Sequence, residues 1–318
     1  MIWNELKKPF TILAPMEGVT DCVFRSVVNR AGRPDLFFTE FTNVSSYASE
    51  RGRHDALERL TVKPEDKPII AQIWGKNPAH FGELAKQLES LGFSGLDLNF
   101  GCPDRQVKKS GGAAMIRTPE LAVECIKQAK ANTSLPVSVK TRLGFTYTEE
   151  YKAWLKLLLE QDLVALTVHL RTRKEMSKVP AHYELIPEII QLRARISSST
   201  KLIINGDIKD QHQISELSQS YPEVDGFMIG RGIFQNPYCF TNHTPTKDDL
   251  LTLFRYHLDQ YDARAKEIEH YPYEPLKRFF KIYINSFDGA SDLRVKLMGC
   301  KNTTELRQVL DDYERAQK

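Results

Sequence analysis

The sequence predicts a (β/α)8 TIM barrel followed by a small all-helical C-terminal domain. Short runs rich in Val, Ile, Leu and Phe alternate about eight times with amphipathic helical patterns, as in a barrel of βα units. Polar residues follow nearly every run, whereas an open doubly wound sheet would concentrate them near one switch point. After Pro237 the β-rich runs stop and only helical patterns remain.

The runs that predict strands lack strict polar alternation, as expected for strands buried on both faces. They cover 11–14, 35–40, 69–73, 93–99, 137–141, 165–170, 201–205 and 225–229. Helices are predicted at 78–91 and 118–131, where a capping residue and a proline precede an apolar stripe. Two more are predicted at 183–196, where Pro187 is expected to kink or restart the helix, and at 210–219.

The boundary between the two domains is expected in the polar segment 241–246. Residues 1–240 form the predicted barrel, and residues 247–318 form the predicted helical domain. The helical patterns of this second part cover 246–269, 275–286 and 303–316.

Composition narrows the class of protein. Lys and Arg number 44 against 41 Asp and Glu, so the net charge of +3 permits nucleic-acid binding through a local patch without requiring it. No segment approaches the ~18 apolar residues of a membrane span, and the N-terminus lacks a secretory pattern. The five cysteines are scattered and form no CxxC pair, which argues against disulfides, zinc and iron–sulfur clusters. We expect a cytoplasmic protein without metal or membrane attachment, and a monomer.

The reactive residues of a barrel come from the loops after its strands, on one face. The candidates at these positions are Pro15, Met16, Glu17, Glu40, Gln72, Asn99 to Pro103, Lys140, Arg142, His169, Arg171, Asn205, Gly206, Asp207, Gly230 and Arg231. Together they form a polar ring with cations, a thiol, an imidazole and two glycine turns.

The two glycine turns, 205–207 and 230–232, follow the seventh and eighth predicted strands. Barrels commonly bind phosphate there through backbone N–H groups, and Arg231 would add a charge-assisted hydrogen bond. Either turn alone is more simply a strand-to-helix connection. As a pair in this position, they favour phosphate binding.

Lys140 lies in the apolar run VSVKT, where an unpaired ammonium is costly, so it needs an anionic or electron-rich partner. The N1/O2 edge of a flavin is one such partner, and a solvated lysine at the barrel rim is the alternative. His169 ends a similar run and is either a site residue or a core histidine bonded to a backbone carbonyl. Gln72 offers a neutral donor and acceptor that suit an imide edge.

Cys102 lies in a Gly-Cys-Pro turn just past a strand, where a thiol is displayed and can act as a general acid. The following loop, 104–112, carries Arg105, Lys108 and Lys109 and ends in Ser-Gly-Gly. This composition suits a lid over a polyanionic substrate, and the alternative is a solvated loop with an idle cysteine.

Several of these segments together resemble the tRNA-dihydrouridine synthase family. The resemblance rests on Ala14 to Asp21, Phe38-Thr39-Glu40, the D-x-N-x-G-C-P stretch Asp97 to Pro103, the K-x-R-x-G stretch Lys140 to Gly144, Asn205 to Ile208 and Met228 to Gly232. Their order covers roughly residues 11–240, and the N-x-G-C-P element is specific. One segment departs from the family, since His169-Leu170-Arg171-Thr172 stands where His-Gly-Arg-Thr is usual.

The resemblance implies an FMN-dependent reduction of the C5–C6 double bond of uridine in tRNA, with NADPH as reductant. It implies that Pro15, Met16 and Glu17 line the flavin, that Gln72 and Lys140 hydrogen-bond its ring system, and that His169 packs against it. It assigns Asn205, Gly206, Asp207, Gly230 and Arg231 to the FMN phosphate and ribityl chain. Cys102 becomes the acid that protonates C5, with Asn99 and Arg142 near the base. The Pro-Met-Glu-Gly segment favours action on the D-loop.

The RNA would contact three basic regions if this resemblance holds. They are the 104–112 loop with Arg105, the 171–178 segment, and the C-terminal helices with Lys277 and Arg278. The aromatic residues Phe279, Phe280 and Tyr283 beside these cations are expected to be core residues, and the basic cluster is alternatively a solvated face.

Two other classes of protein compete with this interpretation. One is an FMN barrel oxidoreductase that acts on a small pyrimidine or an ene-carbonyl compound, which would leave the basic segments without a role. The other is an RNA-binding factor with a vestigial flavin site, which the intact Cys102 and Lys140 oppose.

Overall fold

The computed structural model describes residues 2–103 and 111–317, which divide into two compact units. The first unit takes in residues up to 22, then 34–208 and 212–230, and the second takes in 23–33, 209–211 and the chain from 231 onward. Residues 231–240, which the sequence assigns to the barrel, therefore group with the helical unit.

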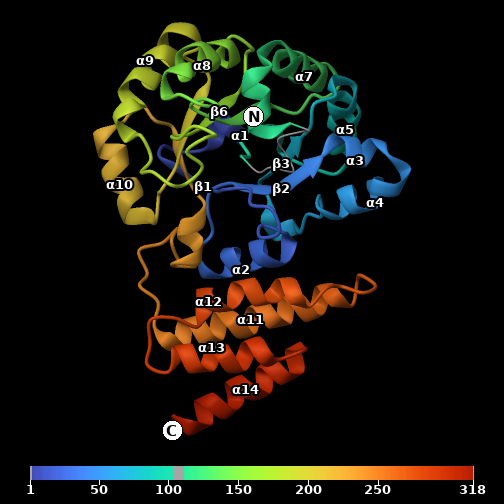
Figure 1. The fold of residues 1–318 in the computed structure, drawn as a ribbon, viewed down its shortest axis with the longest axis vertical. Coiled ribbons are helices and arrows are strands. Elements are labelled where there is room, and N and C mark those ends of the chain that lie inside the picture. The colour runs from blue at the N-terminus through green and yellow to red at the C-terminus, as the bar shows by residue number, and fades with distance from the viewer. Residues whose placement is uncertain (1, 104–110, 318) are drawn as a thin grey trace. The chain divides into compact units, whose positions relative to one another are not determined.

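Eight parallel strands form one curled sheet in the first unit (Figure 1). They are β1 Phe10–Leu13, β2 Phe37–Asn43, β3 Ile69–Trp74, β4 Gly95–Phe100, β5 Val137–Arg142, β6 Ala165–His169, β7 Lys201–Asn205 and β8 Gly226–Ile229. Strand β1 pairs with β8, and an Ile12–Leu36 bridge beside β2 brings the two ends of the sheet together. The predicted (β/α)8 fold is confirmed, with every strand within a few residues of its expected place.

Helices surround this sheet in Figure 1. The first unit contains α1 Ile2–Glu5, α3 Val44–Ala48, α4 Glu50–Glu58, α5 Pro78–Ser90, α7 Pro119–Ala131, α8 Tyr151–Leu159, α9 Ile186–Ile196 and nearly all of α10 Gln211–Ser220. Helix α2 Cys22–Gly32 follows β1 in the chain but belongs, except for its first residue, to the second unit. Short 3-10 turns are η1 Pro64–Asp66, η2 Gly112–Arg117, η3 Thr148–Glu150 and η4 Tyr183–Leu185. Pro187, expected from the sequence to kink or restart a helix, lies in the first turn of α9, so it starts this helix and does not kink it.

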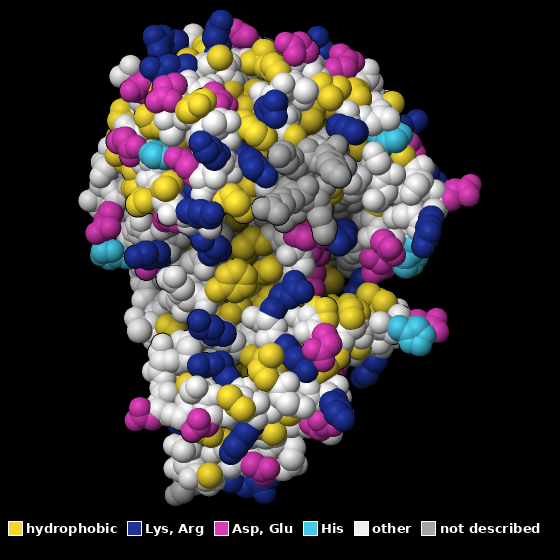
Figure 2. Space-filling view, in the orientation of Figure 1, with side chains coloured by type: hydrophobic (Ala, Val, Ile, Leu, Met, Phe, Trp, Pro, Cys, Tyr) yellow, Lys and Arg dark blue, Asp and Glu magenta, His cyan; other side chains and the backbone are white. Residues whose placement is uncertain are grey.

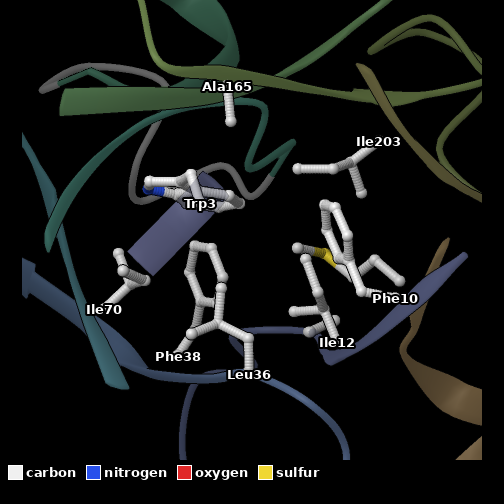
Figure 3. Packing of buried hydrophobic residues seen from close by; sticks show 10 residues of the cluster. Trp3, Phe10, Ile12, Leu36, Phe38, Ile70, Ala165 and Ile203 are labelled. Atoms are coloured by element: carbon white, nitrogen blue, oxygen red, sulfur yellow. The ribbon is translucent and has the colours of Figure 1, made fainter. Parts of the chain in front are cut away.

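The amino-terminal half of the barrel interior is filled with apolar side chains. Trp3, at 1% exposure, lies in a cluster with residues from six strands, and its ring meets that of Phe10 edge to face at a centroid distance of 6.1 Å (Figure 3). The other members of this cluster are Ile12, Ala14, Leu36, Phe38, Ile70, Ala165, Ile203 and Met228. Helix α1 thus supplies the large residue that fills this part of the interior.

The same inward face continues into the polar residues of the predicted site. Successive residues of a strand alternate between faces, so residues two positions apart share one. Gln72 follows the core residue Ile70 at this interval, Asn205 follows Ile203, and His169 follows Ala165 at twice the interval. Along these three strands the barrel interior therefore changes from apolar to polar, and the polar end is the carboxyl end.

The second unit consists mainly of helices. They are α11 Lys247–Ala265, α12 Phe280–Tyr283, α13 Ala290–Gly299 and α14 Thr303–Ala316, with 3-10 turns η5 Arg231–Phe234 and η6 Glu274–Phe279. Phe254 stacks on Tyr283 at 5.0 Å and lies 5.3 Å from Phe280, while Phe279 stacks on Phe24 at 4.8 Å. The expectation that the aromatic residues near 280 are core residues is confirmed.

Within 2–103 and 111–317, every helix is too short or too polar to cross a bilayer. All five cysteines have free thiols, and four of them are buried, whereas Cys102 is half-buried. In the same described part of the chain, no three His, Cys, Asp or Glu side chains come together as a metal site would require.

Candidate active site

A chain of buried hydrogen bonds crosses strands β3, β4 and β5 at the polar end of the barrel. The register places Gln72, Asp97 and Ser138 side by side on these strands. Gln72 Nε2 donates to Asp97 Oδ2 at 2.7 Å, and the Ser138 hydroxyl donates to Asp97 Oδ1 at 2.6 Å. Burial raises the pKa of Asp97 to about 6, even though both of these donors lower it.

Asn99 joins this chain to the turn that carries the thiol. Its Nδ2 donates to Gln72 Oε1 at 3.0 Å, so the amide nitrogen faces Gln72 and the amide oxygen is left for the turn. Its Oδ1 accepts hydrogen bonds from the backbone N–H groups of Gly101 at 3.0 Å and Cys102 at 2.9 Å. The position of the Cys102 turn is therefore set by a side chain of the strand before it, and through that side chain by Gln72 and Asp97.

Lys140 lies beside Asn99 in the register of β4 and β5. Burial lowers the pKa of its ammonium to about 8, helped by the nearby charge of Arg142 and opposed by those of Asp97 and Cys102. Among the described residues, its Nζ forms no hydrogen bond or ion pair. A desolvated ammonium near a thiol suits an electron-rich group of a ligand, as the sequence predicts.

Arg142 is buried and donates to three backbone carbonyls. Its Nε donates to Gly101 at 2.7 Å, and its Nη1 donates to Thr172 at 3.2 Å and to Met176 at 3.0 Å. It therefore joins the Cys102 turn to the segment that follows β6. In this arrangement Arg142 positions two loops around the site, and its predicted contact with the base stays a prediction.

His169 is half-buried, and its Nε2 lies 3.2 Å from Arg171 Nη1. Arg171 is 2% exposed and is held by the Val179 carbonyl at 2.6 Å and by an ion pair with Asp207. Leu170, which replaces the usual glycine, is buried with no exposed surface. The carboxylate of Asp207 thus already has a cationic partner, in addition to its predicted role near a phosphate.

The two glycine turns differ in how much room they leave. Gly206 has φ +126°, and a Cβ there would lie 3.0 Å from Ala181 and 3.3 Å from His169. A Cβ on Gly230 would meet only Ala14, at 3.6 Å. Gly206 is therefore required by the backbone, whereas Gly230 leaves open space beside the chain. Asn205, the first residue of the 205–207 turn, is buried and donates to the Met228 carbonyl at 2.8 Å.

The loop after β1 is held by a carboxyl group from β2. Glu40 accepts a hydrogen bond from the Gly18 N–H, and Arg59 lies 3.7 Å from Glu40 and forms a close ion pair with Glu17. Burial raises the pKa of Glu40 to about 7, and the charges of Asp21 and Glu17 add to the shift while Arg59 opposes it. Pro15 and Met16 are half-buried in the same loop, and Glu17 is exposed.

Three features of these residues bear on whether a flavin fits the site. The ammonium of Lys140, desolvated by burial, suits the electron-rich ring system of a flavin. The turn at Gly206, which requires glycine, and the open space at Gly230 would let the backbone approach the flavin phosphate. The residues present are therefore compatible with a bound flavin.

The structure brings most of the predicted site residues to one end of one barrel. Gln72, Asn99, Cys102, Lys140 and Arg142 are linked by the contacts above or by adjacent register. The neighbouring strand ends carry His169, Asn205, Gly206, Asp207 and Gly230. Arg231 is exposed and is the first residue of the second unit's main segment. Arg105, with the rest of 104–110, lies outside the described residues.

Two predicted substrate contacts belong to the second unit. Lys277 forms an ion pair with Glu274 at 2.8 Å, lies 5.3 Å from the centre of the Tyr273 ring and is 15% exposed. Arg278 is exposed. A phosphate would have to compete with Glu274 for Lys277, and the Arg278 side chain has the greater exposure of the two.

Sequence reasoning missed the roles of Asp97, Ser138 and Arg59. The signal for Asp97 was present, because it stands two residues before Asn99 and must share its face. Ser138 likewise stands two residues before Lys140. Arg59 follows α4, a helix that the sequence pattern did not predict, so nothing in the sequence indicated its contacts with Glu17 and Glu40.

The strand-end site and the eight-stranded barrel define an enzyme of the (β/α)8 class. The family described as "Dihydrouridine synthase (Dus)" matches residues 12–318. This chain belongs to the dihydrouridine synthase family, a family of oxidoreductases.

Two curated relatives match nearly the whole chain. The "Probable tRNA-dihydrouridine synthase 2" of Bacillus subtilis (strain 168) is 52% identical over 316 residues, covering 98% of this chain and 96% of the relative. The "Probable tRNA-dihydrouridine synthase" of Staphylococcus aureus (strain COL) is 50% identical over 315 residues, covering 98% and 95%.

Solved structures with a similar fold are much more distant in sequence. Morphinone reductase is 14% identical with a TM-score of 0.51, over 75% of this chain and 86% of that one. The same comparison with morphinone reductase in complex with tetrahydroNAD gives 13% identity and a TM-score of 0.50, over 75% and 87%. These similarities concern the barrel fold alone.

Proposed function

We propose that this protein reduces the C5–C6 double bond of a uridine in the D-loop of tRNA, with bound FMN and with NADPH as the source of electrons. The names of the Bacillus and Staphylococcus relatives support the reaction and the tRNA substrate. The observation that carries the proposal is the hydrogen bond from the Cys102 N–H to Asn99, beside Lys140 in the barrel interior. The protein would work as a monomer in the cytoplasm.

Lys140, Gln72 and His169 would hold the flavin ring system, with Pro15, Met16 and Glu17 along it. The turns at Asn205-Gly206-Asp207 and Gly230-Arg231 would hold its phosphate and ribityl chain. When bound, reduced FMN supplies the hydride that adds to C6 of the uracil. In this arrangement the anion-binding turns follow β7 and β8, and the acid Cys102 follows β4.

The protein's own chemical step is the delivery of a proton. The Cys102 thiol donates its proton to C5 as C6 gains the hydride, so the double bond becomes a saturated C–C bond and the thiolate takes a proton from solvent afterwards. The Lys140 ammonium, held near the thiol, stabilises negative charge that develops on the uracil or beside it. Asn99 keeps the Cys102 turn in place during this transfer.

A uridine in folded tRNA must leave its stack to reach the interior of a barrel. The helical unit, which we propose as the tRNA-recognition domain over 247–318, would bind the tRNA with Lys277 and Arg278, and the 104–112 loop with Arg105 would contribute from the barrel. Figure 2 shows Lys and Arg side chains interspersed with Asp and Glu on the face it presents, so contacts with phosphates would be local.

The experiment is to map dihydrouridine, position by position, in tRNA from cells with and without the gene. We expect the loss of dihydrouridine at defined positions, restored by the purified protein with FMN and NADPH. Free uridine and uracil are tested alongside. Reduction of these small molecules with no effect on tRNA would instead assign the protein to the small-molecule oxidoreductases.

A further inference from the structure

The loops that follow β5 and β6, together with the last residue of η2, bring aromatic rings and cations together. The Phe145 ring lies between two guanidinium groups, with Arg117 at 5.1 Å and Arg173 at 5.5 Å from its centre. The neighbouring Tyr147 ring has the Lys174 ammonium 5.8 Å from its centre and is 65% exposed. We call these five residues the rim patch.

Hydrogen bonds hold the backbone of the rim patch. The Glu150 carboxylate accepts hydrogen bonds from the N–H groups of Phe145 at 2.7 Å, Thr146 at 3.1 Å and Tyr147 at 2.9 Å. The second loop joins the first where the Arg173 N–H donates to Gly144 at 2.8 Å and the Lys174 N–H donates to Phe145 at 2.9 Å. An exposed aromatic ring on a fixed backbone loses little freedom when a ligand stacks on it.

The rim patch lies at the same end of the barrel as the thiol. Two of its segments are the loops after β5 and β6, Arg117 ends η2 after β4, and Arg142 connects the loop after β6 to the Cys102 turn. One Arg142 side chain reaches both the Gly101 carbonyl, at 2.7 Å, and the Met176 carbonyl, at 3.0 Å. A strand of RNA that delivers a base to Cys102 would therefore have its neighbouring nucleotides near this rim.

The chemistry of the patch suits an unpaired nucleotide. A base stacks on an aromatic face whatever its identity, and adjacent cations bind the phosphate that follows it. A protein partner would be expected to use a larger apolar surface, but near these loops the large exposed apolar side chains within the described residues are only Tyr147 and Met176. Glu150 does not oppose an anion strongly, because its carboxylate already accepts three N–H groups.

We propose that the rim patch binds an unpaired nucleotide next to the target uridine, with its base on Tyr147 and its phosphate at Arg173 and Lys174. This inference rests on the proposed function and assigns to the barrel itself a part of RNA recognition. It also explains why an aromatic ring is held exposed beside cations at this rim.

The test compares binding of an unmodified tRNA transcript to the flavin-loaded protein and its variants by fluorescence anisotropy. Tyr147→Ala should weaken binding about ten-fold, while Tyr147→Phe, which keeps the ring, should stay within about two-fold of the wild type. Lys174→Ala should reduce the slope of log affinity against log salt by about 1. Lys86→Ala, which removes an exposed cation from helix α5, is the matched control and should change neither quantity.

Two results separate this inference from the function on which it rests. If the wild type binds tRNA and forms dihydrouridine but Tyr147→Ala binds as tightly as the wild type, the rim patch has no role and the proposed function stands. If the wild type neither binds tRNA nor forms dihydrouridine, both ideas fail. The rate at which NADPH reduces the bound flavin should be the same in all variants, which excludes a folding defect as the cause of weaker binding.

Discussion

The side-chain oxygen of Asn99 accepts a hydrogen bond from the backbone N–H of Cys102 at 2.9 Å. The same oxygen also accepts from Gly101, and the amide nitrogen of Asn99 is occupied by Gln72. A buried amide with all of these contacts cannot turn freely, so it fixes where the thiol stands. The chemistry proposed for Cys102 therefore depends on residues that never touch a substrate.

Asn99→Ala should leave the N–H groups of Gly101 and Cys102 without their acceptor. We expect a loss of about 1–3 kcal/mol in the free energy of unfolding, because buried donors are left unsatisfied. Dihydrouridine formation should fall by more than this loss of folded protein explains, since the thiol is no longer held. Denaturant titration and single-turnover assays measure the two effects. Equal activity per folded molecule would show that Asn99 does not position the thiol.

The charge of Asp97 should influence the ionisation of Lys140. Burial, aided by Arg142, lowers the pKa of Lys140 to about 8, and the negative charge of Asp97 opposes that shift. Asp97→Asn removes the opposing charge, so the pKa of Lys140 should fall further. The pH dependence of Lys140 acetylation by acetic anhydride in the flavin-free protein, followed by peptide mass spectrometry, measures this change.

Ser138→Ala is the control for that experiment, because it removes a hydrogen bond to Asp97 and keeps the charge. Its reactivity profile for Lys140 should follow the wild type, with a midpoint near pH 8. A wild-type midpoint near the ordinary lysine value of about 10.4 would contradict the desolvated site.

The two glycine turns should respond differently to the same change. Gly206→Ala places a Cβ on a backbone with φ +126° and 3.0 Å from Ala181, so the variant should lose both stability and flavin. Gly230→Ala meets only Ala14 at 3.6 Å, so the fold should be unaffected while a phosphate would lose its space. Thermal unfolding and flavin content after gentle purification distinguish these outcomes. Full flavin content in Gly230→Ala would remove that turn from the proposed phosphate site.

Glu40 should make stability depend on pH. Its pKa is raised to about 7 in the folded protein, so its contribution to stability is present at low pH and is lost as the pH rises through 7. Glu40→Gln keeps an acceptor for the Gly18 N–H without the charge. The variant should be more stable than the wild type at pH 8.5, on the order of 2 kcal/mol, and should lose this advantage below pH 5. Denaturant titrations at both pH values test this, and an advantage that grows on acidification would contradict it.

The barrel could be predicted from sequence because its strands are short, apolar and regularly spaced. Helices without an apolar stripe could not. Helices α3 and α4 are fixed by side-chain caps, where Asn43 accepts from two N–H groups and Ser49 from one, and few apolar residues mark them. Helix α13 exposes Val295 and Met298 while it buries Leu293 and Leu297, so its apolar residues lie on more than one face and form no single apolar stripe in the sequence. The helices α2 and α8 were also absent from the predicted patterns.

The site could be predicted as a set of strand ends, since parallel strands of a barrel finish at one face. Cys102, Lys140 and Asn99 were placed together in this way. What the sequence could not supply was which side chains bind each other. Gln72 is fully buried between Asp97 and Asn99, and Asp207 is paired with Arg171, so both have structural contacts in addition to the cofactor roles predicted for them. Such pairings depend on strand register, which a single sequence does not reveal.

The most direct test of the proposed chemistry is single-turnover formation of dihydrouridine by flavin-reduced Cys102→Ala on an unmodified tRNA transcript. We expect the variant to hold as much flavin as the wild type and to form dihydrouridine about 100-fold more slowly or worse, because a positioned general acid contributes about that factor. A variant that forms dihydrouridine at the wild-type rate would contradict the account, since the proton would then come from elsewhere.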